Sequence, residues 1–349
     1  MKNKLLYIGD RVLKVASGAD HVNKRNQEFI ENIFQVTYYP LIDGFLSKIY
    51  LGIVDSYLRF LDIELVRNHY DYVFVPQSLL GRVCKYIKTK YPTLKIIVFF
   101  HNIEVQYAKE YKKTAGIKAI PFYLATKYWE SQCCQYADYC ITLNKRDSIL
   151  LQDTYGRKSD LELPTSYPDI YDEEKAAKAE MNVINPPIDY LFVGVSFFAN
   201  TQAVQWFIDK VMPHVNGHFH IIGKGMDKYP YKHLNDRIHI HGYVDDLSEY
   251  YYHAKIVVSP IQVGGGMKTK TAEALMYGKT ILGSREAFEG YEIDDECMLL
   301  CKSENDYIYQ INTLSNFSKY INLNSRDLYK KYYNNNILQK RFNSFVANI

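Results

Sequence analysis

The stretch Val257–Ser284 reads VVSPIQVGGGMKTKTAEALMYGKTILGS, with an apolar run rich in β-branched residues, three consecutive glycines and a segment with helical spacing. This order predicts a buried strand that leads through a loop into an amphipathic helix, as in a parallel α/β sheet. Gly264, Gly265 and Gly266 permit backbone conformations that other residues avoid, and they let main-chain amides approach a ligand closely. The stretch therefore predicts a ligand-binding loop at the carboxyl end of a strand.

Charged residues follow the glycines at the start of the predicted helix. A helix that begins near Met267 would direct its free amides and partial positive charge at the loop, which suits a phosphate or diphosphate. Lys268 and Lys270 would add full positive charge, and Glu273 would accept hydrogen bonds from sugar hydroxyls. We interpret the stretch as a nucleotide-sugar site, and the alternative is a surface turn with solvated lysines.

Other phosphate-binding patterns fit this sequence less well. The P-loop needs Gly directly before Lys-Ser/Thr, whereas Met267 intervenes here, and Gly223 and Gly225 in IIGKGMDK lack the third glycine of a dinucleotide fingerprint. The chain contains no Asp-x-Asp pair that would hold a metal ion on a diphosphate. We therefore expect no metal and no other cofactor, with lysines and helix amides neutralising the diphosphate.

Composition limits the class of protein. A chain of 349 residues with 47% hydrophobic content predicts two domains, and a net charge of +3 argues against a nucleic-acid binder. The six cysteines lack CxxC spacing, which favours reduced thiols. The N-terminal apolar run is too short for a signal peptide, and the sequence has no run long enough to span a membrane. We expect a cytoplasmic protein.

Strand-like and helix-like segments alternate in both halves of the chain. KLLYIG, YDYVFVP and LKIIVFFHN are examples in the first half, and IDYLFVGVS, HFHIIGKG and RIHIHGYV in the second. The pattern predicts two Rossmann-like doubly wound α/β domains with a ligand cleft between them. We expect a first domain over 1–165, a linker over 166–188, a second domain over 189–325 and a closing C-terminal helix over 326–349.

The stretch from Val257 to Glu292 resembles the donor-binding region of the GT-B, family 4-like retaining glycosyltransferases, also called glycosyl transferases group 1. The order of strand, Pro, glycine-rich loop, Lys-x-Lys-x-x-Glu-Ala, Gly, strand and Glu-Gly is shared. The resemblance covers about residues 190 to 292, and in the first half it rests on VFFHNIE and YADYCITLNKRDSILLQDTYG. It implies two domains that face a central cleft.

The resemblance assigns roles to the charged residues. Glu273 matches the second acid of the family's Glu-x7-Glu motif, which typically binds the ribose of the donor, and Lys268 and Lys270 match the basic pair that neutralises the departing diphosphate. Gly265 stands where the first acid of the motif is expected, so recognition of the sugar would fall to backbone amides or to groups elsewhere. His101 resembles the histidine that faces the reacting sugar, and we count it with the two lysines as catalytic.

Other donor-binding positions follow from the same resemblance. Gly18 would belong to the glycine loop of the first domain that approaches the donor phosphates, with an ordinary turn before a helix as the alternative. Tyr243 and Val244 stand where such enzymes hold the base by main-chain contacts. Glu289 lies at the Glu-Gly turn that faces the donor.

The activity that the resemblance implies is metal-independent transfer of a hexose, with retention, from a UDP- or GDP-type sugar to a saccharide or lipid-linked acceptor hydroxyl. Such enzymes serve bacterial polysaccharide or glycoconjugate synthesis. Two alternatives stay open. One is a non-catalytic subunit that binds a nucleotide sugar, which the missing first acid favours, and the other is a nucleotide-sugar epimerase of similar shape.

Two further patterns concern metal and membrane. Histidines cluster in the second half, at His214, His218, His220, His239 and His241, yet no carboxylate or cysteine completes a ligand set, so we do not predict a metal site. Tyr107–Glu130, YAKEYKKTAGIKAIPFYLATKYWE, interleaves lysines with aromatic residues. This pattern suits peripheral contact with the inner face of an anionic membrane, and a solvated helix face is the alternative.

Overall fold

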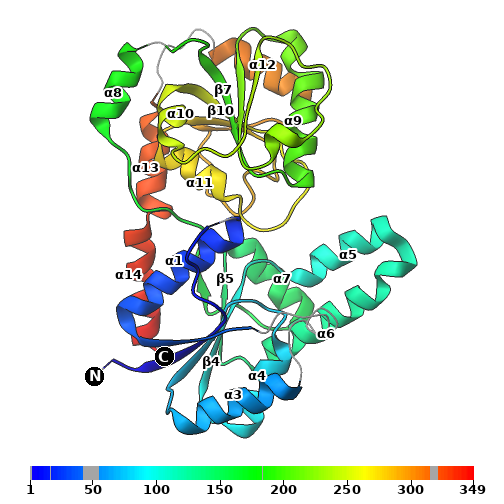
Figure 1. Ribbon diagram of the computed structural model, residues 1–349, viewed down its shortest axis with the longest axis vertical. Coiled ribbons are helices and arrows are strands. Elements are labelled where there is room, and N and C mark those ends of the chain that lie inside the picture. The colour runs from blue at the N-terminus through cyan, green and yellow to red at the C-terminus, as the bar shows by residue number, and fades with distance from the viewer. Residues whose placement is uncertain (1, 16, 42–54, 183, 315–320) are drawn as a thin grey trace. The chain divides into compact units, whose positions relative to one another are not determined.

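The computed structural model describes residues 2–15, 17–41, 55–182, 184–314 and 321–349, and these form two compact units (Figure 1). Unit 1 comprises Met1–Pro164 and Gln339–Ile349, and unit 2 comprises Thr165–Leu338. Each unit contains a six-stranded sheet in which every pairing is parallel. The prediction of two doubly wound α/β domains is confirmed.

Unit 1 has the strand order β2-β1-β3-β4-β5-β6. Its elements in chain order are β1 (Lys4–Ile8), α1 (Gly18–Ile33), β2 (Gln35–Tyr39), α3 (Asp55–Arg67), β3 (Tyr72–Val75), α4 (Gly81–Lys90), β4 (Lys95–Phe100), α5 (Glu104–Ala115), η1 (Gly116–Ala119), α6 (Ile120–Tyr136), β5 (Tyr139–Thr142), α7 (Lys145–Tyr155) and β6 (Leu161–Glu162), followed at the end of the chain by part of α14 (Asn335–Ala347).

Helices cover both faces of the first sheet because its strands are apolar on both sides. Leu6, Val73 and Val98 point into a core formed with α3, α4 and α6. On the opposite face, Phe29 of α1 packs against Phe342 of α14, with ring centroids 6.3 Å apart. The last helix of the chain therefore completes the core of unit 1 (Figure 1).

Unit 2 has the strand order β12-β11-β10-β7-β8-β9. Its elements are α8 (Glu173–Met181), β7 (Ile188–Val193), α9 (Phe198–Lys210), η2 (Met212–His214), β8 (Phe219–Ile222), η3 (Met226–Lys228), β9 (Ile238–His241), α10 (Ser248–His253), β10 (Ala254–Ser259), α11 (Thr269–Met276), β11 (Thr280–Gly283), β12 (Met298–Leu300), α12 (Glu304–Leu314) and α13 (Leu323–Tyr332). The stretch 166–188, which we expected to be a linker, contains α8 and belongs to this unit.

The core of unit 2 also lies on both faces of its sheet. Phe192, Phe219 and Val258 pack against α9 and α12 on one face. On the other face, α11 packs against β11 and α13, and α10 packs against β7. Ala272, Leu275 and Met276 are fully buried, which confirms the predicted core face of the helix after the glycines.

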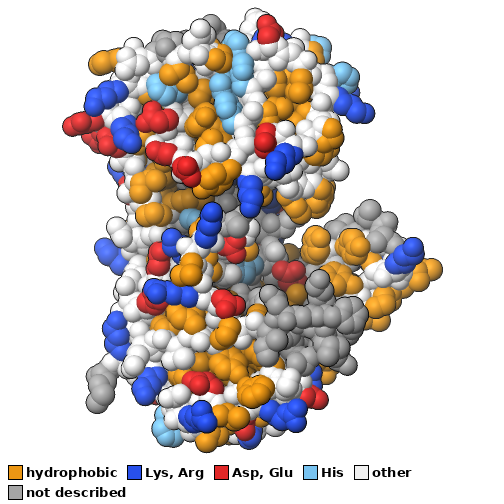
Figure 2. Space-filling model, viewed as in Figure 1, with side chains coloured by type: hydrophobic (Ala, Val, Ile, Leu, Met, Phe, Trp, Pro, Cys, Tyr) orange, Lys and Arg blue, Asp and Glu red, His pale blue; other side chains and the backbone are white. Residues whose placement is uncertain are grey.

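Four histidines form a ladder on neighbouring strands of this sheet. His218 and His239 share a hydrogen bond of 2.9 Å, and His220 and His241 share one of 3.2 Å, with both ring pairs stacked. Figure 2 shows histidine side chains gathered on this unit. Burial, and then the neighbouring His239 and His241, lower the pKa of His220 to about 4. Burial likewise lowers the pKa of His239 and His241, so folding favours the neutral form of these two rings and of His220.

The ladder predicts a loss of stability in acid. A histidine whose pKa is lowered by folding stabilises the native state above its ordinary pKa, and this contribution is lost as the pH falls from about 6.5 towards 4. We expect unit 2 to lose about 2 kcal/mol between pH 7 and pH 5 through His220. His220→Leu should flatten that slope in thermal unfolding, whereas His214→Gln, at an exposed position, should leave it unchanged. Equal slopes in both variants would contradict this account.

Candidate functional site

The topology of unit 2 places the predicted glycine loop at the switch point of the sheet. The chain runs from β7 outward to β8 and β9, then returns to β10 on the other side of β7 and continues outward to β11 and β12. Open α/β sheets bind ligands beyond the carboxyl ends of the two strands where the order reverses. Here these strands are β7 and β10, and the loops that follow them are residues 194–197 and 260–268.

The glycine loop after β10 depends on glycine at two of its three positions. Gly264 has a φ of +156° and Gly266 a φ of +62°, which side-chain-bearing residues rarely adopt. The Tyr291 hydroxyl fixes the end of the loop, because it donates a 2.7 Å hydrogen bond to the Lys268 carbonyl and accepts one of 3.1 Å from the Ala272 amide. The loop therefore leads into α11 along a defined path.

Lys268 is held within the loop by an acidic partner. Its Nζ atom lies 2.6 Å from Glu286 Oε1 and donates hydrogen bonds to the carbonyls of Gly265 and Gly266. Both side chains of the ion pair are largely buried. We did not predict Glu286, although its position, three residues beyond β11, puts it at the same edge of the sheet. Part of the charge of Lys268 is already neutralised by this carboxylate.

The Lys270 side chain lies against the end of β7 and the segment that follows it. A Cβ atom on Gly194, directly after β7, would lie only 2.6 Å from Lys270 Nζ. The ammonium donates a 2.9 Å hydrogen bond to Asn200 Oδ1 and lies 3.9 Å from the centroid of the Phe192 ring. Burial, and then repulsion from Lys268, lower the pKa of Lys270 to about 7. The group is a partly desolvated cation at the point where this fold binds ligands.

Glu273 lies one turn further along α11. Its Oε2 atom accepts a 3.0 Å hydrogen bond from the Tyr251 hydroxyl. Burial raises the pKa of Glu273 to about 7, and the Tyr251 hydrogen bond and the charge of Lys270 oppose this rise. The carboxyl group is thus oriented by a buried tyrosine. It is also close enough to the Lys270 ammonium for the two charges to interact.

The loops after β7 and β8 pack closely against each other. A Cβ atom on Gly223 would lie 2.0 Å from the Gly194 carbonyl oxygen, so only glycine fits there. The amide of Ser196 donates a 2.9 Å hydrogen bond to the Lys224 carbonyl. The glycine turn in IIGKGMDK therefore packs against the Gly194 backbone, which lies beside Lys270. In this unit the turn borders the predicted site.

The remaining predicted residues of unit 2 also follow the carboxyl ends of strands. They differ in how many strands separate them from β10. Glu289 follows β11, the immediate neighbour of β10. Tyr243 and Val244 follow β9. Two strands, β7 and β8, lie between β9 and β10 in the sheet. The Tyr243 side chain is 62% exposed and Val244 is half-buried.

His101 and Gly18 belong to unit 1. Gly18 lies in α1, and His101 is hydrogen-bonded to another residue of that helix. His101 follows β4, and its Nε2 atom shares a 2.9 Å hydrogen bond with Asn23 Oδ1 of α1. Burial, and then the positive charge of Arg25, lower the pKa of His101 to about 4, so the ring is neutral near pH 7. Gly18 is the first residue of α1, whose N-cap Ser17 accepts a hydrogen bond from the Asp20 amide.

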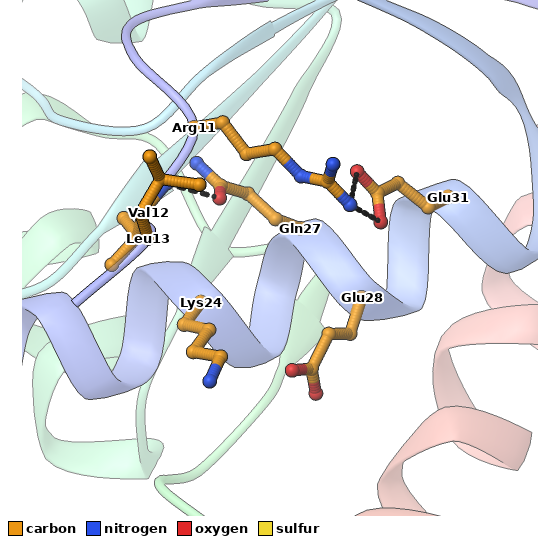
Figure 3. A pocket seen from close by; sticks show the side chains of 7 residues that line it. All are labelled: Arg11, Val12, Leu13, Lys24, Gln27, Glu28 and Glu31. Carbon is orange, nitrogen blue, oxygen red and sulfur yellow. Dashed lines mark hydrogen bonds and ion pairs between the residues drawn. The ribbon is translucent and has the colours of Figure 1, made fainter. Parts of the chain in front are cut away.

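A surface hollow of about 210 Å³ in unit 1 does not contain any of the predicted residues (Figure 3). Arg11 and Glu31 on its wall form a 3.0 Å ion pair, and Gln27 is hydrogen-bonded to the backbone of Asp10 and Val12. Three of its polar side chains, Arg11, Gln27 and Glu31, thus already have partners within the chain. The glycine loop of unit 2 is the stronger candidate site.

The described residues, which are 2–15, 17–41, 55–182, 184–314 and 321–349, bear on the metal and membrane predictions. In these ranges no group of three or more His, Cys, Asp or Glu side chains is arranged to hold a metal ion. Among the same residues, no helix combines the length and the apolar character needed to cross a bilayer.

Comparison with known proteins finds a family match in the second half of the chain. Residues 187–316 match the family model described as glycosyl transferases group 1. This range contains the glycine loop, both lysines and Glu273. No curated protein sequence matches the chain significantly.

Solved structures match over nearly the whole chain at low sequence identity. Sucrose-phosphate synthase from Thermosynechococcus elongatus has a TM-score of 0.78 and 14% identity, with 99% of this chain and 98% of that chain covered. HepE of Anabaena, in complex with UDP, has a TM-score of 0.73 and 10% identity, with coverage of 99% and 100%. A glycosyltransferase from Rickettsia africae has a TM-score of 0.69 and 12% identity, with coverage of 99% and 98%. These matches establish the two-domain GT-B fold.

Proposed function

We propose that this chain, whose residues 187–316 match the glycosyl transferases group 1 family, transfers a sugar from a nucleoside-diphosphate sugar to an acceptor hydroxyl. The observation that carries the proposal is the position of Lys270, whose ammonium fills the space beside Gly194 at the switch point of the second sheet. A partly desolvated cation there would attract an anionic ligand strongly. The HepE structures with UDP and UDP-glucose support a uridine donor.

Transfer with retention would need little from the protein beyond charge and position. The bond from the anomeric carbon to the diphosphate oxygen breaks, the acceptor oxygen attacks from the same face, and the departing diphosphate takes the acceptor proton. Lys270 would stabilise the negative charge that grows on the diphosphate, together with the amides at the start of α11. Lys268 would add to this when it leaves Glu286. Glu273 would accept hydrogen bonds from the ribose hydroxyls.

The first unit would supply the acceptor side. His101 is held neutral and hydrogen-bonded to Asn23, so in our proposal it contacts the reacting sugar as a neutral hydrogen-bonding group. A saccharide or a lipid-linked saccharide is the expected acceptor class, in polysaccharide or glycoconjugate synthesis. No metal ion has a role in this scheme.

A donor screen tests the function. The purified chain would be incubated with UDP- and GDP-sugars in the presence of EDTA, and release of the nucleoside diphosphate would be measured with and without saccharide acceptors. We expect one donor to be hydrolysed slowly and consumed faster with an acceptor. Tight donor binding without any turnover would favour the non-catalytic subunit, for which Gly265 at the first acid position is the main argument. Activity that EDTA abolishes and Mg²⁺ or Mn²⁺ restores would reject the metal-free scheme.

Donor binding should take up a proton. Because the pKa of Lys270 is lowered to about 7, the group is mostly neutral at pH 8, and a bound diphosphate would draw a proton onto it. We expect uptake approaching one proton, and donor affinity that falls by up to about tenfold per pH unit above 7. Calorimetry in two buffers of different ionisation enthalpy measures the uptake, and Lys270→Met should abolish it. Normal donor binding without uptake would show that Lys270 does not contact the diphosphate.

A further inference from the structure

An antiparallel helical hairpin, formed by α5, η1 and α6, extends from unit 1 (Figure 1). The second half of α6 anchors it, because Thr126, Glu130 and Cys133 are buried and α6 packs against α4. The first half of α6 packs against α5, and Tyr111 meets Phe122 edge to face at 6.0 Å. The hairpin thus has a fixed root and a far end around η1.

The hairpin exposes several large apolar side chains. Ile117 in η1 is 84% exposed, and Leu124 in α6 is 57% exposed. The other exposed large apolar side chains of the hairpin are Tyr107, Tyr111, Phe122 and Tyr128. Figure 2 shows hydrophobic side chains over the hairpin, with a basic side chain near its far end. Exposed apolar groups gathered in this way mark an interaction surface.

Lysines lie between these apolar residues. The stretch Tyr107–Glu130 contains five lysines and two glutamates, and one of the two, Glu130, is fully buried. The lysines are Lys109, Lys112, Lys113, Lys118 and Lys127, all of them exposed. The hairpin therefore presents positive charge and apolar groups together.

We propose that this hairpin binds the surface of an anionic phospholipid bilayer, with Ile117 inserted among the acyl chains and the lysines at the headgroups. Tyrosine prefers the interface between headgroups and acyl chains, and the long lysine side chains reach from an apolar surface to anionic phosphates. A second copy of the chain fits less well, because two hairpins would bring their lysines together. Single-stranded nucleic acid fits less well too, because the two most exposed large apolar side chains of the hairpin, Ile117 and Leu124, are aliphatic and would contribute nothing to base stacking. Membrane binding does not depend on sugar transfer.

Co-sedimentation with vesicles tests the surface directly. We expect the chain to bind phosphatidylcholine vesicles that contain about one quarter phosphatidylglycerol, to bind pure phosphatidylcholine far more weakly, and to be released by high salt. Replacing Lys112, Lys113 and Lys118 together by alanine should weaken binding about 100-fold, since each lysine contributes about fivefold. Ile117→Asp should weaken it about tenfold. All four positions are exposed, and thermal unfolding would verify that each variant folds.

Matched substitutions outside the hairpin serve as controls. Leu234→Asp and Lys158→Ala change exposed residues of the same kinds and should leave vesicle binding unchanged. Equal binding to both vesicle types, or full binding by the triple lysine variant, would overturn the proposal. Tighter binding to single-stranded RNA than to anionic vesicles would overturn it in favour of a nucleic-acid surface. Dimerisation that depends on Ile117 without vesicle binding would assign the surface to a second copy.

Discussion

Lys270→Ala should lower kcat by about 100-fold, in addition to weakening donor binding, since the charge on the departing diphosphate is greatest in the transition state. The structure gives two reasons to expect a large effect. The ammonium sits directly beside the Gly194 backbone, and its pKa is already lowered to about 7 by burial, so water screens it poorly. Steady-state kinetics with the donor found in the screen, together with calorimetric donor binding, measures both quantities.

Two further variants separate this account from a general loss of structure. Lys268→Ala should reduce kcat less than Lys270→Ala, because Lys268 is paired with Glu286 at 2.6 Å. Gly194→Ala should also reduce kcat, because its Cβ would lie 2.6 Å from Lys270 Nζ and displace the ammonium. If folded Lys270→Ala protein transfers sugar at the parental rate, the glycine loop is not the diphosphate site, and the non-catalytic subunit becomes the better hypothesis.

The sequence predicted the fold and the position of the glycine loop between a strand and a helix, because both depend on local patterns. Apolar runs at regular spacing indicated parallel strands, and the structure forms two six-stranded parallel sheets from them. Three glycines before a helical pattern indicated a strand, a loop and a helix, which are β10, residues 260–268 and α11. Each of these features is encoded within a short stretch of sequence.

The partners of the charged residues could not be predicted, because they come from distant segments. Asn200 approaches Lys270 from 70 residues away, and Glu286 reaches Lys268 across 18 residues. No local pattern distinguishes Glu286 from the neighbouring acids in SREAFEGYE, and only the packing of α11 against β11 selects it. Which lysine is free to act on a diphosphate therefore became visible only in the folded structure.

A buried carboxylate in unit 1 shows the same limit. Glu130 of α6 accepts hydrogen bonds of 2.8 Å from Ser78 Oγ, 2.8 Å from the Glu104 amide, 3.0 Å from the Val105 amide and 2.8 Å from the Tyr155 hydroxyl. In the sequence, Glu130 is only the last residue of the stretch Tyr107–Glu130, in which lysines and aromatic residues interleave. In the structure Glu130 caps the start of α5 from another helix, which is needed because the N-cap residue, Ile103, has an apolar side chain.

Glu130→Ala should therefore destabilise unit 1 by about 3 kcal/mol, because it leaves buried donors without an acceptor. The loss should be concentrated at α5, whose first amides would exchange with deuterium faster than those of β3 and β4. Glu130→Gln keeps the shape of the side chain and one acceptor oxygen, so it should lose less stability. Tyr155→Phe removes one hydrogen bond to the carboxylate and should lower the free energy of unfolding by about 1 kcal/mol. Hydrogen exchange read at single amides is the suitable measurement, since a two-domain protein need not unfold in one step. Unchanged exchange at Glu104 and Val105 in Glu130→Ala would show that the cap does not stabilise the hairpin, because these two amides bond directly to the carboxylate that the substitution removes.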